Sequence, residues 1–211
     1  VWLGGGTTRI GDPSGKDKTR KILKENQIEK NSRNIENILK KFLDSDYEKT
    51  KPIFLNNYSW LKNLNYISFL RDIGKHFTIN KMLSFDSVKT RLDREQSLSY
   101  MEFNYMILQA YDFLELNNKH DCSLQIGGSD QWGNIINGVD LIKRYSNCEV
   151  YGLTTPLITL ASGAKMGKSE NGAIWLDKKF LSPYDYWQFW RNTDDRDVIK
   201  FLNFFTDLSL E

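Results

Sequence analysis

The stretch LQIGGSDQ (residues 124–131) decides the fold class of this chain. The segment from Ser123 to Ile126 predicts a strand that breaks at the two glycines, and a helix is expected from about Asp130 to Tyr145. Strand, glycines and helix in this order are typical of α/β folds that bind ligands beyond the ends of their strands. The glycines allow the backbone to approach a ligand closely. Asp130 either caps the following helix or accepts hydrogen bonds from ribose hydroxyls.

A long amphipathic segment, SYMEFNYMILQAYDFLEL (residues 99–116), precedes this strand. It predicts a helix with Ser99 as N-cap and Glu102 three residues later. Tyr105, Gln109 and Asp112 are spaced i, i+4 and i+7, so they project from one face. Apolar residues surround them, and polar groups on a mostly buried helix need partners. The stripe therefore either binds a small polar ligand or forms a network inside the core.

A glycine-rich loop follows, with the sequence KMGKSENG (residues 165–172). It is not a Walker A loop, because Ser162 stands where the first glycine is required and a turn and short strand, not a helix, are expected next. The lysines Lys165 and Lys168 either are simply solvated or supply positive charge to a triphosphate.

A second near-match to a phosphate loop, GDPSGKD (residues 11–17), fails the same test. Ile10 occupies the position of the first glycine, and Asp17 replaces the Ser or Thr that would hold magnesium.

The composition is that of a globular protein, with 40% hydrophobic and 27% charged residues among 211. The net charge of +2 neither demands nor excludes a nucleic-acid partner. Cys122 and Cys148 are too few for a disulfide framework and lack metal-ligand spacing, so we expect reduced thiols. No apolar run approaches the roughly 20 residues of a membrane span, and no signal peptide is visible. We therefore expect a soluble protein of a reducing compartment.

The expected fold is α/β with a large helical insertion between Leu61 and Leu116. The opening VWLGGG looks like the end of a strand with its following loop, so we expect the chain to be part of a longer protein. The other expected elements are one or two helices within residues 17–44, a short strand at 52–55, helices over most of 66–116, a strand, loop and strand over 154–176, and aromatic-rich helices at 182–190 and 197–208.

Several of these segments together resemble the tyrosyl-tRNA synthetase family. KMGKS (165–169) is similar to the Lys-Met-Ser-Lys-Ser signature of class I aminoacyl-tRNA synthetases, with Gly167 in place of the commoner Ser. YMILQAYDF (105–113), LQIGGSDQWGN (124–134) and GGTTRIGDPSGK (5–16) each resemble a segment of the family. The similarity covers essentially all 211 residues, including LDREQ (92–96) and SPYDYWQFWRNTDD (182–195). It implies a Rossmann-like class I catalytic domain, truncated at both ends, that spans residues 1–211 with its helical insertion at about 61–116.

The resemblance also assigns roles to the candidate site residues. Asp112 would accept the hydrogen bond of the substrate tyrosine hydroxyl. Tyr105, Gln109 and Asp12 would bind the α-ammonium group of the substrate. Gln131 would lie near its carboxylate, and Gln125 would support the pocket. ATP would be bound by Gly128 and Asp130 at the ribose and by Lys165 and Lys168 at the phosphates, with Lys16 and Arg20 as further catalytic candidates on the opposite loop.

The implied reaction is that of a tyrosine–tRNA ligase in protein biosynthesis. Tyrosine and ATP give tyrosyl-adenylate and pyrophosphate, and the tyrosyl group is then transferred to tRNA(Tyr). ATP is a substrate, Mg²⁺ is expected to accompany it, and no protein metal site is predicted. The family's His-x-Gly-His signature would precede Val1, and its anticodon-binding and small RNA-binding regions would follow Glu211. We therefore expect the chain alone not to form adenylate at a useful rate.

Three alternatives remain open from the sequence: a tryptophanyl-tRNA synthetase, a synthetase-like RNA-binding module without aminoacylation, and a structural helical scaffold. The apolar stretches between Tyr66 and Tyr105 resemble the family's dimer-forming region and suit a homodimer, or they pack within one subunit. The resemblance implies no membrane partner. The location is expected to be the cytoplasm, or a mitochondrion if a targeting segment lies upstream.

Overall fold

The computed structural model describes residues 1–12, 22–43, 48–163, 166 and 174–209. The chain divides into two compact units, Val1–Pro156 and Leu157–Glu211. In the first unit the elements, in chain order, are β1 (Trp2–Leu3), η1 (Thr7–Arg9), α1 (Glu25–Leu43), η2 (Glu48–Thr50), β2 (Leu55–Asn56), α2 (Tyr58–Leu61), α3 (Tyr66–Asp72), η3 (Gly74–His76), α4 (Ile79–Leu83), α5 (Asp86–Asp93), α6 (Tyr100–His120), β3 (Leu124–Gly128), η4 (Ser129–Gln131), α7 (Trp132–Ser146) and β4 (Tyr151–Thr155). The second unit contains α8 (Pro183–Arg191) and α9 (Asp195–Phe205).

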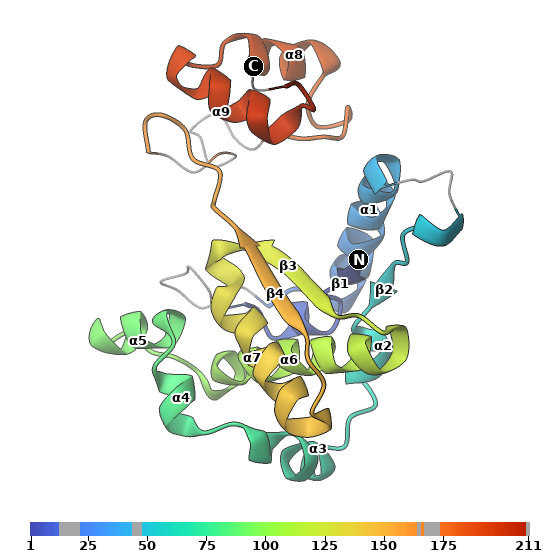
Figure 1. Cartoon of the computed structure of the whole chain (residues 1–211), viewed down its shortest axis with the longest axis vertical. Helices are drawn as coiled ribbons and strands as arrows, with labels where there is room; N and C mark the ends of the chain where they lie inside the picture. The colour runs from blue at the N-terminus through green and yellow to red at the C-terminus, as the bar shows by residue number, and fades with distance from the viewer. Residues whose placement is uncertain (13–21, 44–47, 164–165, 167–173, 210–211) are drawn as a thin grey trace. The chain divides into compact units, whose positions relative to one another are not determined.

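Two pairs of parallel strands form the sheets of the first unit. β1 pairs with β2, and β3 lies beside β4 with Leu124 opposite Tyr151 (Figure 1). Parallel strands cannot be joined by a tight hairpin and need a crossover. Helix α7 supplies it between β3 and β4, and the segment between β2 and β3 contains the helices α2 to α6, joined by short loops. The α/β class and the helical insertion are thus confirmed.

Helices α6 and α7 pack against each other, and α7 also lies against β3 and β4 (Figure 1). Phe113 and Leu114 of α6 and Leu141 and Ile142 of α7 are buried in one core cluster. The close approach of the helices depends on Gly138, because a Cβ at that position would lie 2.9 Å from Cδ1 of Phe113. The core therefore holds α6, and the polar stripe that it carries, in a fixed position.

The N-terminus of α6 has the predicted cap. The Ser99 hydroxyl accepts a hydrogen bond from the Glu102 backbone N–H, and the Glu102 side chain accepts one from the Ser99 backbone N–H. This capping box fixes where the helix begins and hence which side chains share its inner face.

Three predicted element boundaries are wrong. The strand expected from Thr154 is β4, which ends at Thr155 because Pro156 has no N–H to donate. The strand expected up to Leu176 does not form over residues 174–176, where Trp175 instead packs on Phe180 with ring centroids 5.1 Å apart. The short strand expected at 52–55 is displaced and runs over residues 55–56 as β2.

In the second unit, two capped helices share a cluster of aromatic rings. Ser182 caps α8, with Pro183 in its first turn, and Asp194 caps α9. Trp190 packs edge-on against Phe201 and Phe205, with ring centroids 5.7 and 5.1 Å away. The two predicted aromatic-rich helices are therefore confirmed. Within the described part of the chain, none of the helices is long and apolar enough to cross a membrane.

Candidate active site

Asp112 lies at the centre of the first group of polar side chains. It is completely buried on α6. Its Oδ2 accepts a hydrogen bond from Nδ2 of Asn57 at 2.7 Å, and its Oδ1 accepts one from Nε1 of Trp60 at 2.7 Å. The Trp2 side chain also hydrogen-bonds to it. An ionised carboxylate can accept about four hydrogen bonds, so three protein donors leave capacity for one more.

The pKa of Asp112 is set by two opposing effects, burial and hydrogen bonding. Burial raises the pKa of Asp112 to about 7, although the hydrogen bonds from Asn57, Trp60 and Trp2 act to lower it. The carboxyl group therefore titrates near neutral pH. A further hydrogen-bond donor would favour the ionised form and lower the pKa.

Asn57 is a site residue that was not predicted from the sequence. It is completely buried and directly follows β2. Besides Asp112, its Nδ2 donates to Oγ1 of Thr7 at 3.0 Å, and its Oδ1 accepts from the Gly6 backbone N–H at 2.6 Å. One amide side chain thus joins the loop after β1, the end of β2 and helix α6. The signal available in the sequence was a polar pair, Asn56-Asn57, at the end of a short apolar run.

A second group of polar side chains converges on Gln131. Nε2 of Gln109 donates to Oε1 of Gln131 at 3.4 Å, and Nδ2 of Asn134 donates to the same oxygen at 3.1 Å. Nε2 of Gln131 in turn donates to Oδ2 of Asp12 at 3.0 Å. The structure therefore brings together three predicted residues, Asp12, Gln109 and Gln131, from segments far apart in sequence. Asn134 was not predicted.

The other predicted substrate residues lie on the same elements. Tyr105 is half-buried, one helical turn before Gln109 on α6. Gln125 is buried in β3, and among the described residues its Oε1 has no hydrogen-bond partner. An unsatisfied buried oxygen of this kind is free to accept a hydrogen bond from a ligand or a bound water.

The residues predicted to contact ribose lie where β3 ends. Gly128 is the last residue of β3, and Asp130 is exposed in the η4 turn that follows. Helix α7 begins at Trp132 with Gln131 at its N-cap position, so Asp130 does not cap this helix as one of its two interpretations required. Its carboxylate faces solvent at the carboxyl end of a parallel strand, the usual place for ligands in α/β folds.

The predicted phosphate-binding residues Lys16, Arg20, Lys165 and Lys168 lie outside the described residues. Within the described ranges, no group of three or more His, Cys, Asp and Glu side chains is placed to hold a metal ion.

Parallel strands with helical crossovers, together with polar side chains gathered at the strand ends, define a nucleotide-binding type of α/β domain. A family model described as tRNA synthetases class I (W and Y) matches residues 1–211, and the chain belongs to this family.

Relatives within the family are more specific. The chain is 82% identical over 211 residues to the Tyrosine--tRNA ligase of Pelagibacter ubique (strain HTCC1062), covering all of this chain and 52% of that protein. It is 60% identical to the Tyrosine--tRNA ligase of Wolbachia pipientis subsp. Culex pipiens (strain wPip), covering 50% of that protein. The chain thus spans about half the length of these curated relatives.

The fold agrees with the sequence relatives. A C-terminally truncated Aspergillus nidulans mitochondrial tyrosyl-tRNA synthetase superposes with a TM-score of 0.82 at 31% identity, over 99% of this chain and 62% of that one. The predicted resemblance to tyrosyl-tRNA synthetases and the predicted Rossmann-like class I fold are both confirmed.

Proposed function

We propose that the complete protein is a tyrosine–tRNA ligase, which activates L-tyrosine with ATP and transfers it to tRNA(Tyr). The observation that carries this proposal is the environment of Asp112. A fully buried carboxylate that already accepts hydrogen bonds from Asn57 and Trp60 retains capacity for one more donor. A phenolic hydroxyl supplies that donor without adding a charge. The names of the curated relatives support the same assignment.

The rest of the amino acid would be held by the group around Gln131. The α-ammonium would be bound by Asp12, Tyr105 and Gln109, and Gln131 would lie near the carboxylate, with Gln125 supporting the pocket. The hydrogen bonds from Gln109 to Gln131 and from Gln131 to Asp12 support this arrangement, because they fix an amide and a carboxylate next to each other.

In the reaction, an oxygen of the tyrosine carboxylate forms a bond to the α-phosphorus of ATP. The bond from that phosphorus to the oxygen bridging to the β-phosphate breaks, so tyrosyl-adenylate forms and pyrophosphate leaves. No protein nucleophile is required. Catalysis would depend on positioning the two substrates and on stabilising the charge that develops on pyrophosphate.

Gly128 and Asp130 would contact the ribose of ATP, and their position at the end of β3 supports this assignment. The charge on the phosphates would be met by Lys16, Arg20, Lys165 and Lys168, an assignment that rests on the sequence. Mg²⁺ would enter with ATP.

Amino-acid-dependent exchange of pyrophosphate into ATP tests the proposal, measured on the protein expressed from its complete reading frame. Exchange is expected with tyrosine and not with tryptophan or phenylalanine. Exchange that depends on tryptophan would favour the tryptophanyl alternative, and binding of tRNA without exchange for any amino acid would favour an RNA-binding module.

Tyrosine affinity is expected to depend on pH through Asp112. The ionised carboxylate is the stronger acceptor for the phenolic hydrogen bond, and the pKa of Asp112 in the free site is about 7. Affinity should therefore rise by up to about tenfold between pH 6 and pH 8 and level off above. Calorimetric titration of tyrosine across this range measures it, with ATP affinity as the control.

The variant Asn57→Ala sharpens this pH test. The hydrogen bond from Asn57 acts to lower the pKa of Asp112, so its loss should move the midpoint of tyrosine affinity to higher pH. A tyrosine affinity that is constant between pH 6 and pH 8 would count against Asp112 as the phenol acceptor.

The proposed assembly is a homodimer in the cytoplasm. Exposed apolar side chains gather on the helices of the insertion, at Tyr66, Ile67 and Leu70 of α3 and at Ile79 and Leu83 of α4. Exposed apolar groups in such number are typical of an interface between subunits. Sedimentation of the complete protein at micromolar concentration tests this, and a monomeric mass would exclude it.

A further inference from the structure

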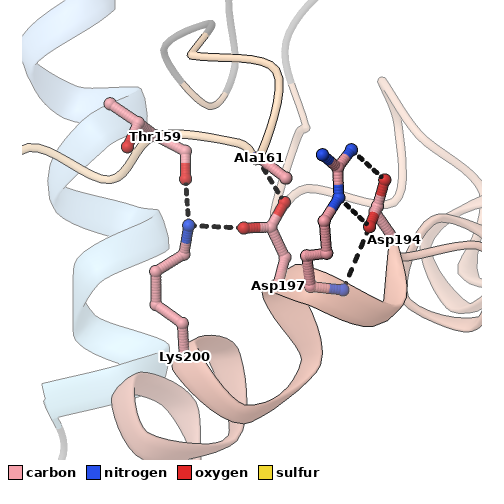
Figure 2. A network of polar contacts seen from close by, with 6 residues as sticks. Thr159, Ala161, Asp194, Asp197 and Lys200 are labelled. Atoms are coloured by element: carbon pink, nitrogen blue, oxygen red, sulfur yellow. Dashed lines mark hydrogen bonds and ion pairs between the residues drawn. The ribbon is translucent and has the colours of Figure 1, made fainter.

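An ion pair on α9 holds the backbone of the loop segment 159–161 in the second unit (Figure 2). Oδ2 of Asp197 accepts a hydrogen bond from the backbone N–H of Ala161 at 2.6 Å. Oδ1 of Asp197 accepts one from Nζ of Lys200 at 2.5 Å, and Nζ of Lys200 also donates to the backbone carbonyl of Thr159 at 2.5 Å. The pair therefore binds one backbone donor and one backbone acceptor of the same short segment.

The carboxylate of Asp197 is buried for a reason other than capping of α9. Asp197 is 2% exposed although it lies in the first turn of α9. Both of its oxygens are engaged by groups outside its own backbone, while the helix cap is provided by Asp194, whose side chain accepts from the Arg196 N–H. The hydrogen bonds from Lys200 and then Ala161 lower the pKa of Asp197, which keeps the carboxylate charged at neutral pH. Capping of α9 therefore does not explain why this carboxylate is buried.

The clamped segment continues into the sequence KMGKS (165–169). The Gly163 N–H donates to the Leu160 carbonyl at 2.8 Å, and Gly163 has a φ of +81°, which closes a tight turn. The backbone N–H of Met166 then donates to the Ile158 carbonyl at 2.9 Å. Met166, the second residue of KMGKS, is thus bonded to the residue immediately before the clamped Thr159.

We propose that Asp197 and Lys200 are positioning residues for the ATP step of the reaction. They touch neither substrate. By fixing residues 159 and 161, they fix the Ile158 carbonyl that accepts the hydrogen bond from the backbone of Met166 in the KMGKS sequence. This inference rests on the proposed function, which assigns the KMGKS sequence to the phosphates of ATP. A purely structural role would affect the kinetics of both substrates. The positioning role predicts a change in kcat/KM for ATP and no change in KM for tyrosine.

The test is the kinetics of pyrophosphate exchange by the complete protein, with KM measured separately for ATP and for tyrosine. In Asp197→Ala both contacts of the carboxylate are lost, and kcat/KM for ATP is expected to fall about tenfold or more, since small misplacements of catalytic groups have effects up to about 100-fold. KM for tyrosine and the calorimetric affinity for tyrosine should stay within about twofold. Asp197→Asn keeps an acceptor for Ala161 but loses the charge. Its kcat/KM for ATP should lie between those of the wild type and Asp197→Ala.

Variants of Lys200 provide a second route to the same result if Asp197→Ala does not fold. Lys200→Met removes the donor to Thr159 and should reproduce the ATP-specific loss. Lys200→Arg keeps a cation with several donors and should restore most of the activity. The matched control is Arg196→Gln, which breaks an exposed ion pair with Asp194 on the same helix turn and should change neither KM.

The outcomes distinguish failure of the positioning role from failure of the proposed function. Equal losses for ATP and tyrosine, or a lowered Tm without an ATP-specific change in any of the variants, would refute the positioning role and leave the proposed function standing. Absence of tyrosine-dependent exchange in the wild-type protein would refute the proposed function, and this inference with it.

Discussion

The variant Asp112→Ala is expected to lower kcat/KM for tyrosine in pyrophosphate exchange by about 30- to 1000-fold, while KM for ATP stays within about twofold. A bound phenolic hydroxyl would then be buried without its acceptor, and losing a hydrogen bond to a charged, desolvated partner costs roughly 2–4 kcal/mol, with each 1.4 kcal/mol worth about tenfold. Exchange kinetics at varied tyrosine concentration measure the effect.

A companion variant separates loss of the charge from loss of the side chain. Asp112→Asn has nearly the same shape, but its NH₂ group must face a donor, either Asn57 or Trp60. It should therefore also lose tyrosine activity. The matched control is Asp140→Asn on α7, where the carboxylate pairs with Lys81 and is partly exposed. Wild-type kinetics for tyrosine in Asp112→Ala would remove the basis of the proposed phenol contact.

The parts of the site that were predictable from sequence are those fixed by local geometry. Ser99 and Glu102 form a capping box that sets the start of α6, and the helical period then places Tyr105, Gln109 and Asp112 on one face. The burial predicted for Asp112 follows from the apolar residues around it. None of these inferences requires knowledge of where another segment lies.

The parts that were missed depend on contacts between distant segments. Asn57 and Trp60 reach Asp112 across 55 and 52 positions of sequence, and no periodicity near residue 57 encodes that meeting. The strand predicted to end at Leu176 failed for the same reason, because a short apolar run becomes a strand only where an unpaired strand edge is available to it.

The salt bridge between Arg91 and Glu102 was also beyond the sequence analysis, and it leads to the second large effect. Arg91→Met is expected to lower the free energy of unfolding by about 3–5 kcal/mol, since it removes the cation from a buried ion pair and leaves the carboxylate charge of Glu102 buried. Both side chains are only 3% exposed, and Nη1 of Arg91 lies 2.9 Å from Oε1 of Glu102. For a unit of this size the loss corresponds to a fall in Tm of roughly 6–20 °C, measurable by calorimetry on the complete protein.

The effect is expected to be large because the pair has further partners. Arg91 also donates to the Ser97 carbonyl, and the Glu102 carboxylate accepts from the Ser99 N–H and hydroxyl. Removing either charge therefore loosens the cap of α6 as well as the link to α5. Arg91→Lys should be intermediate, because an ammonium cannot reproduce the forked geometry of guanidinium. Arg33→Met, which breaks an exposed pair with Glu29 on α1, should shift Tm by no more than about 2 °C.

The pH dependence distinguishes this ion pair from simple packing. Burial by itself would raise the pKa of Glu102, but the hydrogen bonds from Arg91 and Ser99 prevail and lower it below its usual 4.5. The folded state therefore binds this proton more weakly than the unfolded state does. The contribution of the pair to stability is full above about pH 4.5 and is lost as the pH falls through the lowered value. The difference in Tm between wild type and Arg91→Met should accordingly be constant from pH 6 to pH 8 and shrink in acid. A difference that persists unchanged in acid would mean that Arg91 stabilises the fold by packing alone.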